Sequence, residues 1–188
     1  MAKTIIKDLA ESGMAVNDIF TKANEKLCEN NESGMFVTAW MGILDLETGP
    51  IRYANAGHNP PVVRHKDGSY EYLKGRANFV LAGMEGVRYR EQQLQLQQGD
   101  EIYLYTDGVT EAHNIDKQLF GEDRLLVSLN ETTGMTVDEI CRKVKADVDS
   151  FQGEAEQFDD ITMLMFLKMV NGLRTQIVLK LLLTNVFL

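Results

Sequence analysis

The chain has 188 residues, of which 44% are hydrophobic and 25% are charged, a composition typical of a single globular domain with a hydrophobic core. Its formal net charge of −9 disfavours nucleic acid and anionic membrane as main partners, because both are negatively charged themselves. The two cysteines, Cys28 and Cys141, form no Cys-x-x-Cys motif, so neither a disulfide framework nor a structural zinc site is indicated.

Two helices are predicted at the start of the chain. Residues 3–11 place apolar side chains on one side of a helix, and the apolar residues from Val16 to Leu27 recur at helical spacing. Lysine and aspartate interrupt the first of these stretches, so we expect no signal peptide and a cytoplasmic location. The polar cluster at 30–34 predicts a loop after the second helix.

A series of strands is predicted next, separated by turn residues. The candidate strands are 36–46, 50–57, 60–65, 70–73, 91–97, 101–106 and, near the end of the chain, 161–167. Residues 91–97 alternate leucine with glutamine, which predicts a half-exposed strand. By contrast, 101–106 (EIYLYT) and 161–167 (ITMLMFL) are apolar on both faces, so we expect each to be covered on either side.

Two further helices are predicted between these two apolar strands. The first covers 121–129, and the second covers 136–152, where Thr136 and Glu139 have the spacing of a capping box. The expected inner stripe of the second helix consists of Val137, Ile140, Cys141, Val144, Val148 and Phe151. Segregated helices and antiparallel strands predict an α+β domain, built as a layered antiparallel β-sandwich with helices outside.

The end of the chain, 170–188, is an apolar tail interrupted by Arg174 and Lys180. It is short for a membrane span, so no membrane association is expected. We predict an extra helix that packs on the body of the domain or on a second copy of the chain. An unnatural or misread C-terminus is the alternative.

Acidic residues stand at the ends of the two apolar strands. Asp107 follows 101–106, while Asp159 and Asp160 precede 161–167. If the strands are antiparallel neighbours, Asp107 converges with Asp159 or Asp160, and carboxylates brought together repel unless a cation joins them. Oxygen ligands select Mg²⁺ or Mn²⁺ above zinc. The alternatives are an ordinary turn at Asp107-Gly108 and a solvated strand entry at the Asp159-Asp160 pair.

Four segments, in this order, resemble the bacterial SpoIIE-like branch of the PPM (type 2C) metal-dependent serine/threonine protein phosphatases, which includes RsbU-like regulators. They are FVTAWMGILDLETGPIRYANAGHNPP, QQGDEIYLYTDGVTEAHN, FGEDRL and FDDIT. The resemblance covers residues 1–169 and leaves 170–188 outside it. It implies two stacked antiparallel sheets flanked by helices, in agreement with the layers expected above.

The resemblance also implies a metal site. In the family, the Asp of the Thr-Asp-Gly motif and the first Asp of the Asp-Asp-x-Thr motif bind Mn²⁺ or Mg²⁺, and these positions are Asp107 and Asp159 here. Asp160 stands where many relatives carry Asn, so it is expected to assist as a neighbour. Two such ions activate a bridging water that attacks phosphorus, without a protein nucleophile. The implied partner is a phosphoserine or phosphothreonine protein, such as an anti-sigma-factor antagonist.

One family motif has no counterpart in the sequence. A Gly-Asp-x-x-Gly-His/Lys-Gly segment, whose Asp bridges both metals, should lie just upstream of a helix resembling residues 2–11. We therefore expect a domain that is incomplete at its N-terminus, has an empty or singly occupied site and is inert or nearly so. The alternative function is a non-catalytic, phosphatase-like regulatory module. An exposed sheet edge near the start of the chain would favour a homodimer.

The three histidines are not expected to form a catalytic group. His58, in ANAGHN (54–59), stands where eukaryotic relatives carry an acidic residue. A structural histidine bonded within a tight turn is the favoured interpretation, and a position beside substrate phosphate or an accessory ion is the alternative. His65 and His113 are predicted to be solvated loop residues, and Trp40 is predicted to be part of the core.

Overall fold

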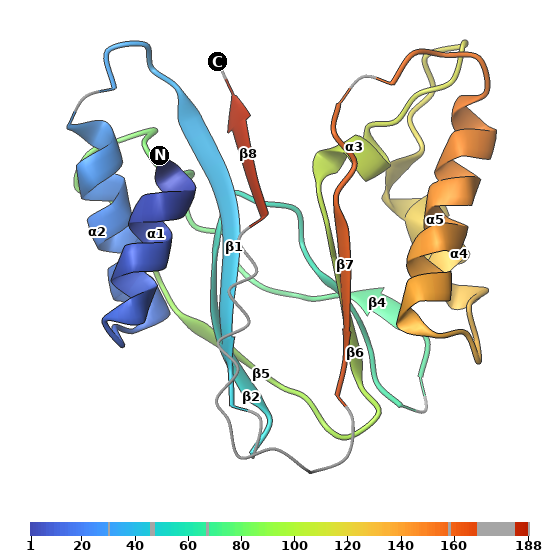
Figure 1. The fold of residues 1–188 in the computed structure, drawn as a ribbon, viewed down its shortest axis with the longest axis horizontal. Coiled ribbons are helices and arrows are strands. Elements are labelled where there is room, and N and C mark those ends of the chain that lie inside the picture. Colours follow the sequence, from blue (N-terminus) through green and yellow to red (C-terminus); the bar gives the residue numbers. More distant parts are fainter. Residues whose placement is uncertain (30, 46–47, 67, 158, 169–182, 188) are drawn as a thin grey trace. The chain divides into compact units, whose positions relative to one another are not determined.

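The computed structural model describes residues 1–29, 31–45, 48–66, 68–157, 159–168 and 183–187 (Figure 1). The chain divides into two compact units. The first comprises Met1–His58, Lys74–Leu96 and Asn171–Leu188, and the second comprises Asn59–Leu73 and Gln97–Val170. In the described residues, each unit has a four-stranded sheet in which neighbouring strands pair antiparallel, together with its own helices. This content confirms the predicted α+β class.

The first unit combines two helices with a sheet of strand order β5-β2-β1-β8. Its elements are α1 (Ala2–Glu11), α2 (Val16–Cys28), β1 (Phe36–Leu44), β2 (Pro50–Ala56), β5 (Gln92–Gln95) and β8 (Leu183–Phe187). Both predicted N-terminal helices are confirmed, and β5 alternates half-buried and exposed residues, as predicted.

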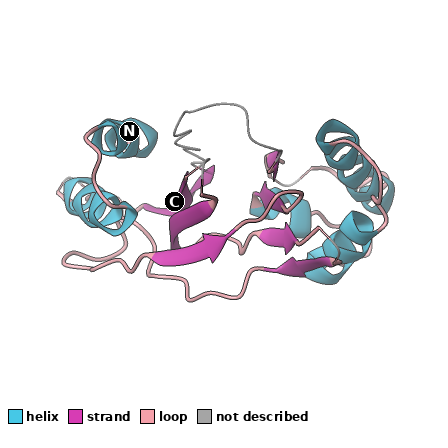
Figure 2. Ribbon diagram, turned by 90° about the horizontal axis from the view of Figure 1, so that it is seen from below, coloured by secondary structure: helices cyan, strands magenta, loops and turns pink. Residues whose placement is uncertain are grey.

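The two faces of β1 are both buried, and they carry different side chains. Val37, Ala39 and Met41 join the apolar faces of α1 and α2 in one hydrophobic core. Both helices lie beside this sheet in Figures 1 and 2. Trp40 lies on the alternate face, where its ring stacks on Tyr53 at a centroid distance of 5.5 Å. Trp40 is only 2% exposed, which confirms its predicted place in the core.

The second unit has a sheet of strand order β4-β3-β6-β7. Its elements are β3 (Val62–Arg64), β4 (Tyr70–Tyr72), β6 (Glu101–Tyr105), α3 (Asp107–Thr110), α4 (Gly121–Asn130), α5 (Val137–Gln152) and β7 (Met163–Leu167). The two longer helices were predicted, whereas the four-residue α3 was not. One core contains residues of β3, β4, β6 and β7 together with α4 and α5.

Helix α5 begins at the predicted capping box. The Thr136 N–H donates to Glu139 Oε2 at 2.8 Å, and the Glu139 N–H donates to Thr136 Oγ1 at 3.4 Å. The inner stripe is buried at Ile140 and Val144 but not at Val137, which is 37% exposed. Val137 is the first residue of the helix, so it lies before the turn at which α5 meets the core, and this part of the predicted stripe was wrong.

The two apolar strands differ in burial. Every residue of β6 is buried, as predicted. In β7 only Met165 is buried, and its neighbours are half-buried. The expectation that β7 is covered on both faces was therefore wrong, because β7 stands at the edge of the described sheet and pairs there with β6 alone.

Part of the apolar tail forms a strand. Residues 183–187 form β8, which pairs antiparallel with β1 from Phe36↔Phe187 to Trp40↔Leu183. The predicted helix is wrong for these residues, and their threonine, valine and phenylalanine favour strands. Strand β8 thus covers one edge of β1. Residues 169–182 and 188 lie outside the described part of the chain. None of the helices described is both long and apolar enough to cross a bilayer.

Asp100 organises the turn before β6. It is 2% exposed, and its carboxylate accepts hydrogen bonds from the Gln97 N–H at 2.8 Å, the Lys66 N–H at 3.0 Å and His65 Nδ1 at 2.9 Å. His65 was predicted to be a solvated loop residue. It is indeed exposed and lies in a loop, and its ring pairs with this carboxylate. Burial alone would raise the pKa of Asp100, but the hydrogen bonds outweigh it and lower the pKa below its ordinary value.

We expect Asp100→Asn to lower the free energy of unfolding at pH 7 by about 1–3 kcal/mol, because a charged acceptor of hydrogen bonds is lost. A carboxyl whose pKa is lowered in the folded state stabilises it above the ordinary pKa, about 3.9, and this contribution is lost as pH falls through the lower folded pKa. The difference in the free energy of unfolding between wild type and variant, measured by urea unfolding, should therefore become smaller below pH 4. The exposed Asp116 provides the control substitution Asp116→Asn, and an equal loss in both variants would contradict the prediction.

Candidate metal site

The two aspartate motifs meet at one end of the β6–β7 pair. These strands are antiparallel, and their last paired residues are Tyr105 and Met163. Just beyond them, the Thr106 N–H donates to the Thr162 carbonyl at 3.0 Å. Asp107 follows β6 after one residue, Thr106, and the Asp159-Asp160 pair comes two residues before β7. The predicted neighbourhood of the two strand ends is therefore confirmed.

Asp107 begins a helical turn and does not form an ordinary Asp-Gly turn. It is 8% exposed and is the first residue of α3, whose geometry is held by a bond from the Glu111 N–H to the Asp107 carbonyl at 2.7 Å. The φ angle of Gly108 is not positive. The turn interpretation, which relied on the tolerance of glycine for positive φ, is therefore wrong.

Gly108 is required for a different reason, namely a close approach of the second motif. A Cβ atom at this position would lie 2.5 Å from the Asp160 carbonyl oxygen and 3.3 Å from that of Asp159. Both contacts are with backbone, which cannot turn aside as a flexible side chain can. The glycine of the first motif thus leaves space for the backbone of the second.

Hydrogen bonds hold the Asp159-Asp160 segment. The Asp160 N–H donates to Asp159 Oδ1 at 2.6 Å, which fixes the Asp159 carboxylate over its own backbone. The Gln157 amide donates to the Asp159 carbonyl at 2.8 Å. Asp159 is half-buried, whereas Asp160 is exposed. Asp159 is thus the more constrained of the two carboxylates, in line with the smaller role expected of Asp160.

Glu111 is a fourth acidic residue near the site, and it was not among the residues predicted from the sequence. Partial desolvation raises the pKa of its carboxyl, and the negative charges of Asp107 and Asp159 raise it further. These three groups therefore lie close enough to interact electrostatically. Glu111 is four residues after Asp107, a spacing that brings two residues to the same side of a helical turn. The sequence contains this four-residue spacing, but the spacing predicts that Asp107 and Glu111 are neighbours only if 107–110 is known to be helical.

The type of donor fits a hard divalent ion, since carboxylate oxygens suit Mg²⁺ and Mn²⁺. The number of donors is smaller than two ions require. Within the described ranges, no three His, Cys, Asp or Glu side chains gather in a way that could hold a metal ion. Metal binding by Asp107, Asp159 and Asp160 remains a prediction.

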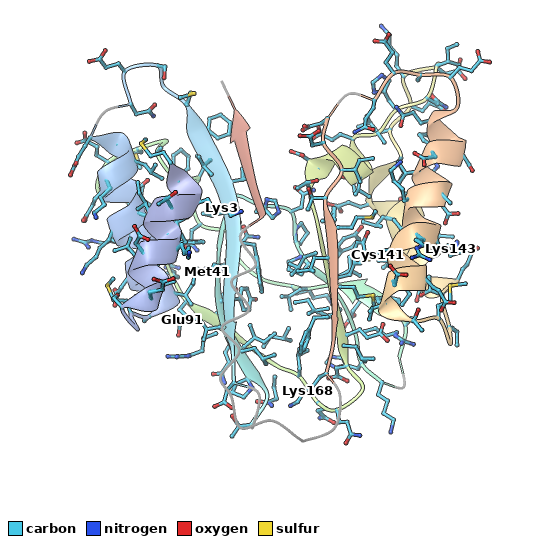
Figure 3. The ribbon with its side chains drawn as sticks, in the orientation of Figure 1. Lys3, Met41, Glu91, Cys141, Lys143 and Lys168 are labelled. Carbon is cyan, nitrogen blue, oxygen red and sulfur yellow. The ribbon has the colours of Figure 1, made fainter. Side chains whose placement is uncertain are left out.

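Neither cysteine has the lowered pKa of an activated nucleophile. Burial, followed by the charge of Asp138, raises the pKa of the Cys141 thiol on α5 (Figure 3). Burial, followed by the charge of Glu85, likewise raises that of Cys28. A reactive cysteine would need the opposite shift. The chemistry that best suits the chain therefore relies on its carboxylates.

His58 is a structural residue of its turn, in agreement with the favoured interpretation. It is 4% exposed, and its Nδ1 lies 3.1 Å from Thr38 Oγ1. The backbone of His58 is bonded on both sides to the Asn55 side chain, with its N–H donating at 2.7 Å and its carbonyl accepting at 2.8 Å.

Sequence comparisons connect the chain with one protein family and with two bacterial relatives. The profile of the family described as Stage II sporulation protein E (SpoIIE) matches residues 1–167. Protein IcfG of Synechocystis sp. is 32% identical over 136 residues, which are 72% of this chain and 21% of IcfG. The phosphoserine phosphatase RsbU of Bacillus subtilis is 29% identical over 112 residues, which are 59% of this chain and 33% of RsbU. The chain thus spans about a fifth and a third of these two relatives.

Solved structures show the same fold. The SiaA-PP2C domain of Pseudomonas aeruginosa matches with a TM-score of 0.74 and 22% identity, covering 88% of this chain and 67% of that one. The phosphatase domain of the cell fate determinant SpoIIE from Bacillus subtilis, presoaked with Mn, matches with a TM-score of 0.62 and 15% identity, covering 93% and 76%. These likenesses confirm the predicted PPM phosphatase-like fold.

Proposed function

Because the chain belongs to the SpoIIE family, we propose that it forms a metal-dependent protein phosphatase domain that hydrolyses phosphoserine or phosphothreonine in a regulatory protein. The observation that carries the proposal is the close approach of the two aspartate motifs, where Gly108 leaves space for the Asp159-Asp160 backbone. An ordinary turn and an ordinary strand entry would not need this contact.

Asp107 and Asp159 would hold Mn²⁺ or Mg²⁺, and Asp160 would assist from its exposed position. Such ions, when bound, supply an activated water and neutralise charge on the phosphate. The residues of this chain supply the charged oxygens and hold them in place. Glu111 adds negative charge to the same neighbourhood, which favours a cation there over a free anion.

The 188 residues carry fewer ligands than the family uses. The Gly-Asp-x-x-Gly segment, whose Asp bridges both ions in the family, does not occur in them. We therefore expect this polypeptide to bind one ion weakly or none, and to be inert or nearly so. Like charges brought together without a bridging cation raise at least one pKa, and the raised pKa of Glu111 is consistent with that crowding.

The substrate we propose is a phosphorylated anti-sigma-factor antagonist in a cytoplasmic partner-switching pathway. Support comes from the likeness to RsbU, a phosphoserine phosphatase. A non-catalytic regulatory module, acting by binding or as a homodimer, is the second candidate, and the missing ligand motif is the observation that favours it.

The proposal is tested by calorimetric titration with Mn²⁺ and by hydrolysis of a phosphoserine protein. Both measurements are made on the 188 residues and on a longer version of the protein that includes the missing motif. We expect weak or no Mn²⁺ binding and little hydrolysis for the former, and two bound ions with Mn²⁺-dependent hydrolysis for the latter. Two tightly bound ions and full activity in the 188 residues would show that the bridging ligand has been misplaced. A longer version without activity would favour the non-catalytic module.

A further inference from the structure

Thr106 makes three hydrogen bonds to the segment that contains the second aspartate motif. Its side-chain hydroxyl donates to the Asp160 carbonyl at 2.9 Å and accepts from the Thr162 N–H at 2.9 Å. Its own N–H donates to the Thr162 carbonyl at 3.0 Å. Thr106 is 5% exposed, so water does not readily replace these partners.

The hydroxyl holds the chain at a point where regular strand pairing has already ended. The last β6–β7 pair joins Tyr105 to Met163, and an apolar side chain at 106 would leave the Asp160 carbonyl and the Thr162 N–H without the hydroxyl that now pairs with both. A hydroxyl can donate one hydrogen bond and accept two. Threonine or serine is therefore suited to bind both groups at once.

The same contacts determine where the Asp159 carboxylate lies. Thr106 holds the carbonyl of Asp160, and the N–H of the same residue donates to Asp159 Oδ1. On the other side, Gly108 lets the Asp159 and Asp160 carbonyls come close to the turn that begins at Asp107. Thr106 and Gly108 thus hold the Asp159-Asp160 segment from the two positions that flank Asp107.

We propose that Thr106 is a positioning residue of the metal site, which fixes the Asp159 carboxylate relative to Asp107 and thereby sets the affinity for a divalent ion. The inference rests on the proposed function and goes beyond it, because it assigns a role to a residue that is not itself a ligand. Removing a group that orients a ligand typically lowers metal affinity about 10- to 100-fold.

Three variants test the proposal. Thr106→Val keeps the shape of the side chain but removes the hydroxyl, and Thr106→Ser keeps the hydroxyl. Thr132→Val is the matched control, because Thr132 is also buried in the second unit and its hydroxyl donates to the Leu129 carbonyl, remote in sequence from both motifs. Each variant is made in the longer protein that includes the missing motif. It is compared with wild type by Mn²⁺ titration followed by electron paramagnetic resonance, by melting temperature, and by amide hydrogen exchange of residues 159–162 without metal.

We expect Thr106→Val to bind Mn²⁺ at least about 10-fold more weakly than wild type, with Thr106→Ser close to wild type. Its amides at 159–162 should exchange faster without metal. Thr132→Val should melt at a lower temperature but retain both wild-type affinity and slow exchange at 159–162. Equal Mn²⁺ affinity in Thr106→Val and wild type, or an equal loss in Thr132→Val, would overturn the proposal.

Failure of the proposed function gives a different result. Wild type would then bind no Mn²⁺ in either the 188-residue or the longer protein, and exchange alone decides whether Thr106 positions the segment. Faster exchange at 159–162 in Thr106→Val, but not in Thr106→Ser, supports the positioning role. Unchanged exchange overturns it.

Discussion

Replacing Asp107 with Asn is expected to reduce Mn²⁺-dependent phosphatase activity to background in a protein that carries all the family motifs. Asparagine keeps the size of the side chain but removes the charge that holds the ion, and the proposed chemistry depends on that ion. The measurement is hydrolysis of a phosphoserine protein over a range of Mn²⁺ concentrations. Turnover close to that of wild type would overturn the assignment of Asp107.

The stability of the same variant without metal gives a second, independent result. The negative charge of Asp107 contributes to the raised pKa of Glu111, so the carboxylates near the site oppose one another in the absence of a cation. Removing one of these charges should leave the melting temperature unchanged or raise it. Asp116→Asn, an exposed substitution in the same unit, should alter neither activity nor melting temperature. A large drop in melting temperature for Asp107→Asn would mean that the loss of activity reports misfolding.

Regular elements were predictable because their signals are local. The apolar spacing of α1 and α2 and the capping box at Thr136 each specify a helix from a few neighbouring residues. The pairing of β8 with β1 joins residues that are far apart in the sequence, for example Phe36 and Phe187. No local pattern specifies such a pairing, and the apolar tail was accordingly predicted as a helix.

The candidate site was predictable only in part, for a related reason. The positions of Asp107 and Asp159 at the ends of apolar strands indicated that they would lie at the same end of a sheet. A helical turn of four residues is too short to show any periodicity, and Asp-Gly is a stronger signal for an ordinary turn. Missing α3 meant missing Glu111, whose relation to Asp107 depends on that turn.

Replacing Gly108 with Ala is expected to destabilise the protein by about 1–3 kcal/mol, the typical cost of overpacking a close contact. The added Cβ would lie 2.5 Å from the Asp160 carbonyl oxygen, so one of two backbone segments has to move. Alanine favours helix over glycine by at most about 1 kcal/mol, and Gly108 lies within α3. The gain in helix propensity is thus no larger than the smallest expected cost of the clash. We therefore expect the clash to outweigh it and the net change in stability to be a loss.

Urea unfolding and Mn²⁺ titration of this variant, made in a protein that carries all the family motifs, separate the effect of the contact on stability from its effect on metal binding. Displacement of the Asp159-Asp160 segment should lower Mn²⁺ affinity as well as stability, because the ligand moves with its backbone. Gly68→Ala is the matched control, since the nearest described atom to a Cβ at Gly68 is the His65 carbonyl oxygen, at an ordinary 3.6 Å. The stability of this variant should stay the same or rise slightly. If Gly108→Ala were as stable as wild type, the close approach of the two motifs would not be the reason for glycine here. A loss of stability with unchanged Mn²⁺ affinity would instead show that the packing of this turn stabilises the fold without affecting metal binding.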